Sequence, residues 1–120
     1  MLNCLAVGLG GFLGSVLRYL LSLAPLSRAG AFPWNTLVTN VLGAFAIGLI
    51  AAALSRGGSL DPRLVLFLKT GVCGGFTTFS TFALETAGLL QSGRCLPAAL
   101  YILLSLGLSL AAVLLAEQLL

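Results

Sequence analysis

The sequence predicts an all-α integral membrane protein with four transmembrane helices, and two observations carry that prediction. Of its 120 residues, 59% are hydrophobic and only 8% are charged, with a mean hydropathy of +1.13. Because a soluble domain carries about 25% charged residues, this chain could not cover a surface that faces water. A membrane-spanning helix needs roughly 20 apolar residues, which leaves room for about four spans with short connections. We therefore expect residues 1–120 to form a single transmembrane domain.

The first span is expected over residues 2–23 and the second over residues 34–54. The N-terminal segment MLNCLAVGLGGFLG lacks a basic region and continues without a break, which favours a first span over a signal peptide. Pro25 and Pro33 then mark a loop. Trp34 suits the start of the second span, because tryptophan is enriched where a membrane meets water.

The third span is expected over residues 63–90 and the fourth over residues 97–119. Asp61 is placed to cap the third helix, with a proline at the first helical position. The pair Gly74-Gly75 interrupts this span, so we expect the third helix to be broken near it. Irregular backbone at membrane depth is tolerated only where it is buried in protein or lines a cavity.

Several function classes are disfavoured by composition. The 6 basic and 3 acidic residues are too few for a nucleic-acid surface. The chain has no histidine, which removes the commonest general base and metal ligand. Its three cysteines are an odd number without C-x-x-C spacing, and we interpret them as small apolar fillers. We expect neither an enzyme nor a nucleic-acid partner.

The basic residues of the predicted loops are divided equally between the two sides of the membrane. Arg56 and Arg63 lie on one side, and Arg28 and Arg94 lie on the other. Orientation follows the excess of Lys and Arg on the cytoplasmic side, and here neither side has an excess. Either another factor sets the topology, or the chain inserts in both orientations and forms an antiparallel dimer.

Polar side chains within the spans are costly in a membrane and mark function by default. Helical spacing places them in three stripes, each on one helical face. The stripes are Thr36, Asn40 and Gly43 in the second span; Thr78, Thr81 and Glu85, flanked by Phe79 and Phe82, in the third; and Tyr101, Ser105 and Ser109 in the fourth. Packing of membrane helices explains any single stripe about as well as function does. Three stripes together favour a binding path.

The chemistry of these stripes suits a small anion. Neutral hydroxyl and amide donors let an anion shed its water without holding it too tightly. The two phenylalanines of the third span fit this interpretation, because the edge of an aromatic ring is electropositive. Full positive charges within the spans are confined to Arg18 and Lys69, each near one end of a span. Carbonyl groups freed by the break in the third span are suitable ligands for a hard cation.

Three segments carry a resemblance to a known family. GVCGGFTTFSTF, NTLVTNVLGAFAIG and GGFLGSVLRYLL resemble, in order and spacing, the signature segments of the Fluc (CrcB) family of fluoride channels. The resemblance implies an antiparallel, dual-topology homodimer in the bacterial plasma membrane. Such a dimer passively exports cytoplasmic fluoride through two pores and so reduces its toxicity. A structural sodium ion, which is not transported, is implied at the dimer centre.

The resemblance also implies roles for individual residues. Gly74 and Thr77 match the positions whose backbone carbonyls hold the sodium ion. Phe79 and Phe82 match the paired phenylalanines of the pore, and Asn40 matches the pore asparagine. The other implied pore residues are Thr36, Tyr101, Ser105 and Ser109, with Arg18 at the vestibule and Glu85 at the end of the polar track. Ser80 and Thr81 are expected to supply hydroxyls beside the rings.

Three positions depart from the family pattern. Asn35 stands where the family usually has glycine, and Val113 stands where some members extend the polar track with threonine. Lys69 is unusual for the pattern and has no implied role.

Two other functions are less consistent with the sequence. A small multidrug-type exporter needs a membrane-embedded carboxylate, usually in the first span, and here that span has none. Glu85 is the remaining intramembrane candidate. A scaffold subunit that transports nothing would leave the three polar stripes without a purpose.

Overall fold

The computed structural model describes residues 1–28 and 31–120. Within these residues four helical segments are long and apolar enough to cross a membrane, and no strand is present. The segments are α1 (Leu2–Ser22), α2 (Trp34–Ser55), a composite third span (Pro62–Gln91) and α6 (Cys95–Leu119). The predicted all-α fold with four spans is confirmed, and the predicted bounds differ from these by at most two residues.

The third span consists of four helical pieces. The first three follow one another directly, and a break separates them from the fourth. The pieces are α3 (Pro62–Val65), the π-helix η1 (Leu66–Cys73), α4 (Gly74–Phe76) and α5 (Phe79–Gln91). The Asp61 side chain accepts a 2.7 Å hydrogen bond from the Arg63 N–H and caps α3, as predicted. The break follows α4, where Thr77 (φ −81°, ψ 157°) and Thr78 (φ −149°, ψ 118°) are extended. The break is therefore near the predicted glycine pair, although both glycines are themselves helical.

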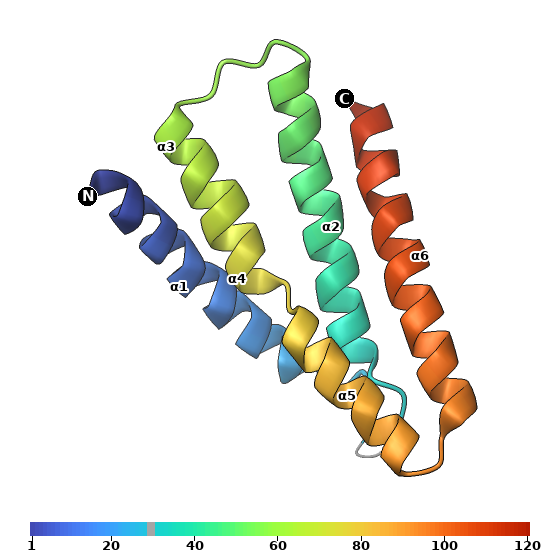
Figure 1. Ribbon diagram of the computed structural model, residues 1–120. Coiled ribbons are helices and arrows are strands. Elements are labelled where there is room, and N and C mark those ends of the chain that lie inside the picture. The colour runs from blue at the N-terminus through green and yellow to red at the C-terminus, as the bar shows by residue number, and fades with distance from the viewer. Residues whose placement is uncertain (29–30) are drawn as a thin grey trace.

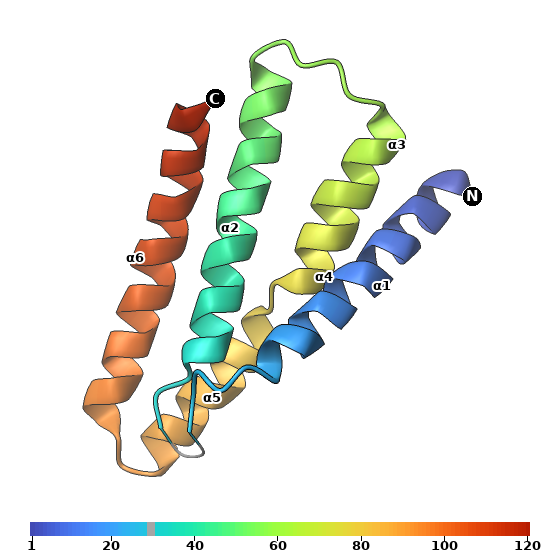
Figure 2. The same cartoon turned by 180° about the vertical axis from the view of Figure 1, so that it is seen from behind.

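The helices form two packed pairs that the third span connects (Figure 1). α2 packs along α6, and α1 packs along η1 and α4. Beyond the break, the third span continues as α5, which packs against α6 (Figure 2). Both termini lie at the same end of the molecule as the loop between α2 and α3 (Figure 1). This arrangement places the break where the two helix pairs meet.

Glycines allow the backbones of α1 and the third span to touch. A Cβ atom on Gly71 would lie 2.7 Å from Cα of Gly10, and a Cβ atom on Gly75 would lie 2.6 Å from the carbonyl oxygen of Gly11. Small residues permit this kind of close approach between membrane helices. The glycine pair before the break therefore includes a packing residue, and α1 is held firmly against the segment that leads into the break.

Apolar side chains cover much of the outer surface. Leu9, Phe12 and Leu103 are each more than 60% exposed, and many other leucines are similarly exposed. Extended apolar surface of this kind marks contact with lipid or with another protein. The small interior core consists of Leu37, Leu89, Ala98 and Tyr101. Most of the chain's apolar surface is thus directed away from the protein interior.

Candidate functional site

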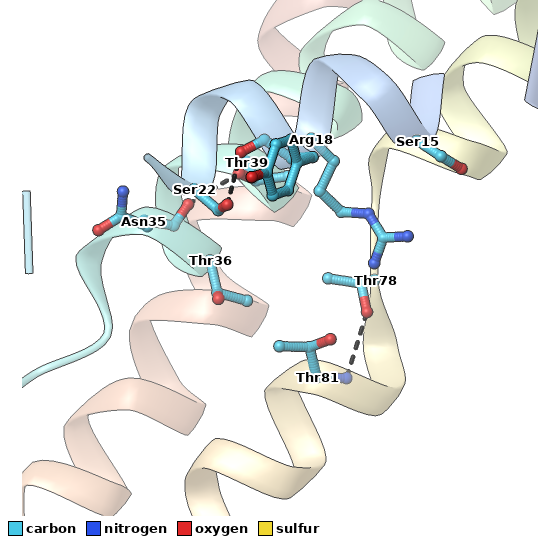
Figure 3. Close-up of a pocket in the computed structure, with 9 residues that line it drawn as sticks. Ser15, Arg18, Ser22, Asn35, Thr36, Thr39, Thr78 and Thr81 are labelled. Atoms are coloured by element: carbon cyan, nitrogen blue, oxygen red, sulfur yellow. Dashed lines mark hydrogen bonds between the residues drawn. The ribbon is translucent and has the colours of Figure 1, made fainter. Parts of the chain in front are cut away.

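Two cavities lie on either side of the break in the third span. The first, which we call the vestibule, has a volume of about 300 Å³ (Figure 3). The second, which we call the groove, has a volume of about 340 Å³. Thr78 lines both cavities. The extended segment of the third span therefore forms the boundary between them.

The vestibule combines one positive charge with hydroxyl groups. Arg18 extends from α1 toward Thr78, and the residues around it are polar (Figure 3). The vestibule is lined by Ser15, Arg18, Tyr19, Ser22, Asn35, Thr36, Thr39, Thr78 and Thr81. A guanidinium group and several hydroxyls provide hydrogen-bond donors without any carboxylate. This cavity can attract and partly desolvate an anion.

Of the predicted site residues, Arg18, Thr36 and Thr81 lie together in the vestibule. Ser15 and Ser22 also line it but were not among the predicted site residues. Their spacing from Arg18, three residues before and four residues after, is the helical periodicity that places all three on one face of α1. That spacing is a signal in the sequence from which these two serines could have been identified.

The groove brings together residues from α2, the third span and α6. Asn40, Phe79, Phe82, Ser105 and Ser109 all line it, as do Gly74 and Thr77 beside the break. Stripes from three different helices therefore meet around one cavity. Thr36 lies in the other cavity, so the predicted stripe on α2 is shared between the vestibule and the groove.

Ser105 is the most informative side chain of the groove. Ser105 is only 8% exposed, and its Oγ is buried without a hydrogen-bond partner among residues 1–28 and 31–120. Buried polar groups in proteins nearly always have a partner, and leaving one unsatisfied costs about 1–3 kcal/mol. An unpaired hydroxyl at the wall of a cavity is therefore available to donate a hydrogen bond to a ligand.

The two phenylalanines differ sharply in their surroundings. The ring centroids of Phe79 and Phe82 lie 5.6 Å apart, with an angle of 49° between the ring planes. Phe82 also packs against Tyr101, with centroids 5.0 Å apart. Phe79 is 77% exposed, which is unusual for a large aromatic residue unless a lipid or a second protein covers it.

Three of the predicted pore residues line neither cavity: Ser80, Glu85 and Tyr101. Tyr101 is fully buried, and its hydroxyl donates a 3.2 Å hydrogen bond to Oε1 of Glu85. Ser80 is exposed on α5. Tyr101 does not reach the groove itself, but its ring packs against the ring of Phe82, which lines the groove.

The break is held by hydrogen bonds to the side chain of Asn40. Its Nδ2 donates to the Thr78 carbonyl at 3.0 Å, and its Oδ1 accepts from the Thr78 N–H at 2.8 Å. One side-chain amide thus pairs with both backbone groups of the extended residue. Thr78 in turn caps α5, because its Oγ1 accepts from the Thr81 N–H at 3.2 Å.

These bonds redirect two backbone donors. In an unbroken helix, each N–H donates to the carbonyl four residues earlier. The Thr78 N–H would then bond to Gly74 and the Thr81 N–H to Thr77, but both now donate to side chains. The carbonyls of Gly74 and Thr77 therefore lose their helical donors. Carbonyl oxygens are the ligands that hard cations take, so these two groups fit a sodium ion.

The described part of the chain contains no cluster of the side chains that most often bind metals. Among residues 1–28 and 31–120, no group of three or more His, Cys, Asp and Glu side chains could hold a metal ion. The candidate cation ligands at the break are backbone carbonyl oxygens instead.

The three departures from the family pattern have different surroundings. Asn35 donates from Nδ2 to the carbonyls of Leu21 (3.0 Å) and Ala24 (2.8 Å), and so fastens the end of α1 to the start of α2. Val113 packs beside Gly48 of α2 and does not line the groove. Lys69 is exposed on η1, and nothing in the structure explains its presence there.

Comparisons with known proteins agree with the resemblance. The family model described as "CrcB-like protein, Camphor Resistance (CrcB)" matches residues 5–116. A protein of Rhizobium meliloti named "Fluoride-specific ion channel FluC" is 50% identical over 114 residues, covering 94% of this chain and 91% of the relative. A protein of the same name from Chlorobaculum tepidum is 51% identical over 112 residues, covering 92% and 88% of the two chains.

A more distant relative extends the match to almost the full length. The protein of that name from Ruminiclostridium cellulolyticum is 44% identical over 120 residues, covering 99% of this chain and 92% of the relative. Nearly the whole chain is thus matched by the family model and by relatives of similar length. The chain is a multi-pass membrane protein that belongs to the CrcB family.

Proposed function

We propose that this chain forms a fluoride-specific ion channel that passively exports cytoplasmic fluoride and so reduces its toxicity. The unpaired, buried hydroxyl of Ser105 in the groove is the observation that supports this function most directly. The names of the relatives, all "Fluoride-specific ion channel FluC", supply the identity of the anion. No enzymatic role is proposed.

The ion path runs from the vestibule past the break and along the groove. Arg18 attracts the anion, and the hydroxyls of Thr36 and Thr81 begin to replace its water. In the groove the donors are neutral, since Ser105 and Ser109 face an amide and aromatic rings. Neutral donors bind a small anion firmly enough to admit it and weakly enough to release it.

The edges of the phenylalanine rings contribute to the same path. Phe79 and Phe82 line the groove beside the serines, and ring edges carry partial positive charge. Ser80 lies on the exposed side of α5 and Glu85 is bonded to Tyr101, so these three residues act at the margins of the path. Glu85 and Tyr101 support the ring of Phe82 and mark one end of the polar track.

An antiparallel, dual-topology homodimer completes the pores. The balanced loop arginines allow insertion in both orientations. Phe79 is 77% exposed and Gly74 is also exposed, although both line the groove. A second copy packed here would cover Phe79 and close the groove, so that each of two pores is lined by both subunits.

A structural sodium ion at the dimer centre is the second component of this proposal. The Gly74 and Thr77 carbonyls, which lack their helical donors, would hold it together with the same two groups of the partner subunit. The bound cation supplies positive charge near the groove and is not transported. The residues of the chain orient these carbonyls, and the Thr77 side chain is fixed by the bond that its Oγ1 donates to the Cys73 carbonyl at 2.9 Å.

Passive export needs no energy source beyond the membrane potential. Hydrogen fluoride is a weak acid that enters cells as a neutral molecule and dissociates in the more alkaline cytoplasm. A potential of about 100 mV, negative inside, drives one anion outward with roughly 2.3 kcal/mol. That free energy sustains a gradient of about fifty-fold, since about 1.4 kcal/mol corresponds to a factor of ten.

Liposomes that contain the purified protein test this function. Loaded with fluoride and given a potassium-driven voltage, they should release fluoride to an external electrode, whereas chloride-loaded liposomes should retain their anion. A proton-coupled exporter would instead require a pH gradient, and a scaffold would release nothing. Comparable release of fluoride and chloride would contradict the proposed specificity.

A further inference from the structure

We propose that Asn40 positions the cation ligands, so that one side-chain amide couples the anion path to the sodium site. This inference depends on the proposed function, because both the path and the sodium ion are part of it. Asn40 lines the groove, and it is also hydrogen-bonded to the backbone of Thr78 on both sides. The first contact concerns the anion in the groove, and the second concerns the backbone next to the cation ligands. Asn40 therefore acts on both ions.

The first step is the register of the broken helix. By accepting the Thr78 N–H at 2.8 Å, Oδ1 of Asn40 takes the donor that would otherwise reach the Gly74 carbonyl. Nδ2 of Asn40 donates to the Thr78 carbonyl at 3.0 Å, and this bond helps to hold Thr78 in the extended conformation. The conformation that exposes the Gly74 and Thr77 carbonyls is therefore stabilised by a residue 38 positions away in the chain.

A second contact from α2 acts on the neighbouring residue. Gly43 lies one helical turn after Asn40, and a methyl group at this position would overlap Cγ2 of Thr77. The Thr77 hydroxyl is fixed on the other side by its bond to the Cys73 carbonyl. One face of α2 thus holds both extended residues, Thr77 through packing and Thr78 through hydrogen bonds.

The amide of Asn40 retains capacity for the anion. Its NH₂ group has two hydrogens, and one is used by the Thr78 carbonyl. The second hydrogen is available to an ion in the groove, beside Ser105 and Ser109. If the amide rotated to face the anion, its two bonds to Thr78 would weaken. A bound cation would oppose that rotation by stabilising the extended conformation of Thr77 and Thr78, and would so keep the amide in position for the anion.

The test compares sodium binding with fluoride flux in matched variants. The midpoint of the sodium-dependent rise in thermal stability is measured for the detergent-solubilised dimer, with potassium as the replacement cation. Asn40→Ala removes both bonds to Thr78 and should raise the sodium midpoint at least tenfold. Asn40→Leu keeps a similar side-chain volume but removes the same two bonds without adding a charge, and it should raise the midpoint by a similar factor.

Two further variants separate the cation effect from the anion effect. Ser109→Ala also alters the groove but lies on α6, away from the break, so it should reduce fluoride flux and leave the sodium midpoint unchanged. Gly43→Ala crowds Thr77 without touching the Asn40 amide and should raise the sodium midpoint. This variant keeps the inference testable if Asn40→Ala does not fold.

The outcomes distinguish this inference from the function on which it depends. If wild-type protein shows sodium-specific stabilisation and both Asn40→Leu and Gly43→Ala keep the wild-type midpoint, the inference is wrong. If the wild-type protein transports fluoride but is equally stable in sodium and potassium, the sodium site itself is wrong. A raised midpoint in the variants on α2, with a normal midpoint in Ser109→Ala, supports the coupling.

Discussion

Replacing Ser105 with alanine should separate stability from transport. The Ser105 hydroxyl is buried without a partner, and an unsatisfied buried group costs about 1–3 kcal/mol. Its removal should leave the free energy of unfolding unchanged or raise it by about 1 kcal/mol. A hydrogen bond to a charged acceptor contributes about 1.5–3 kcal/mol, so fluoride binding at this point should weaken by about tenfold or more.

Thr86 provides a matched control on the neighbouring helix. Thr86 and Ser105 are equally buried, each 8% exposed, but the Thr86 hydroxyl donates a 2.7 Å bond to the Phe82 carbonyl and lines neither cavity. Thr86→Val should therefore lower stability by about 0.5–1.5 kcal/mol and leave fluoride flux intact.

Thermal unfolding in detergent and fluoride efflux from liposomes measure the two quantities. The expected pattern is loss of flux without loss of stability in Ser105→Ala, and the reverse in Thr86→Val. If Ser105→Ala is destabilised by 1 kcal/mol or more, on the order of one lost hydrogen bond, and keeps its flux, the hydroxyl serves packing and the reasoning is refuted.

Three further predictions concern the rings, the topology and the turn between α1 and α2. Phe82→Ile, or Phe79→Ile, should reduce fluoride efflux strongly while gel filtration still shows a dimer; near-normal efflux would mean that the rings serve packing. A terminal tag should be accessible from both sides of one membrane, and about two or three lysines added to loop 56–61 should bias orientation and lower activity, whereas a uniform orientation in active wild-type protein would exclude the antiparallel dimer. Asn35→Ala removes two hydrogen bonds to α1 and should lower thermal stability by about 1–3 kcal/mol; an unchanged unfolding temperature would contradict that anchoring role.

Local signals account for the parts of the fold that the sequence predicted. Span length and apolar composition located four helices to within two residues. The acceptor on Asp61 and the proline after it identified the start of the third span, because capping depends on adjacent residues only. The three polar stripes were visible from helical spacing, and members of all three now meet around the groove.

Contacts between distant segments could not be predicted from local signals in the sequence. The pairing of Asn40 with Thr78 joins residues 38 positions apart, and no local pattern indicates it. It places the extended residues after the glycine pair, while Gly75 packs against α1. The bonds from Asn35 to the end of α1 likewise depend on how a loop folds. The surroundings of Phe79, which is 77% exposed in the single chain, depend on lipid or on another protein and are likewise not set by residues near it in the sequence.

The central claim is that fluoride moves passively and selectively through this protein, and the reversal potential tests it most directly. The measurement uses a planar bilayer with a tenfold fluoride gradient, equal chloride on both sides and equal pH. A passive fluoride channel predicts zero current at the fluoride equilibrium potential, about 59 mV in magnitude for a tenfold gradient of a monovalent ion. A reversal potential that stays near zero, as a chloride or proton conductance would give under these conditions, would contradict the account.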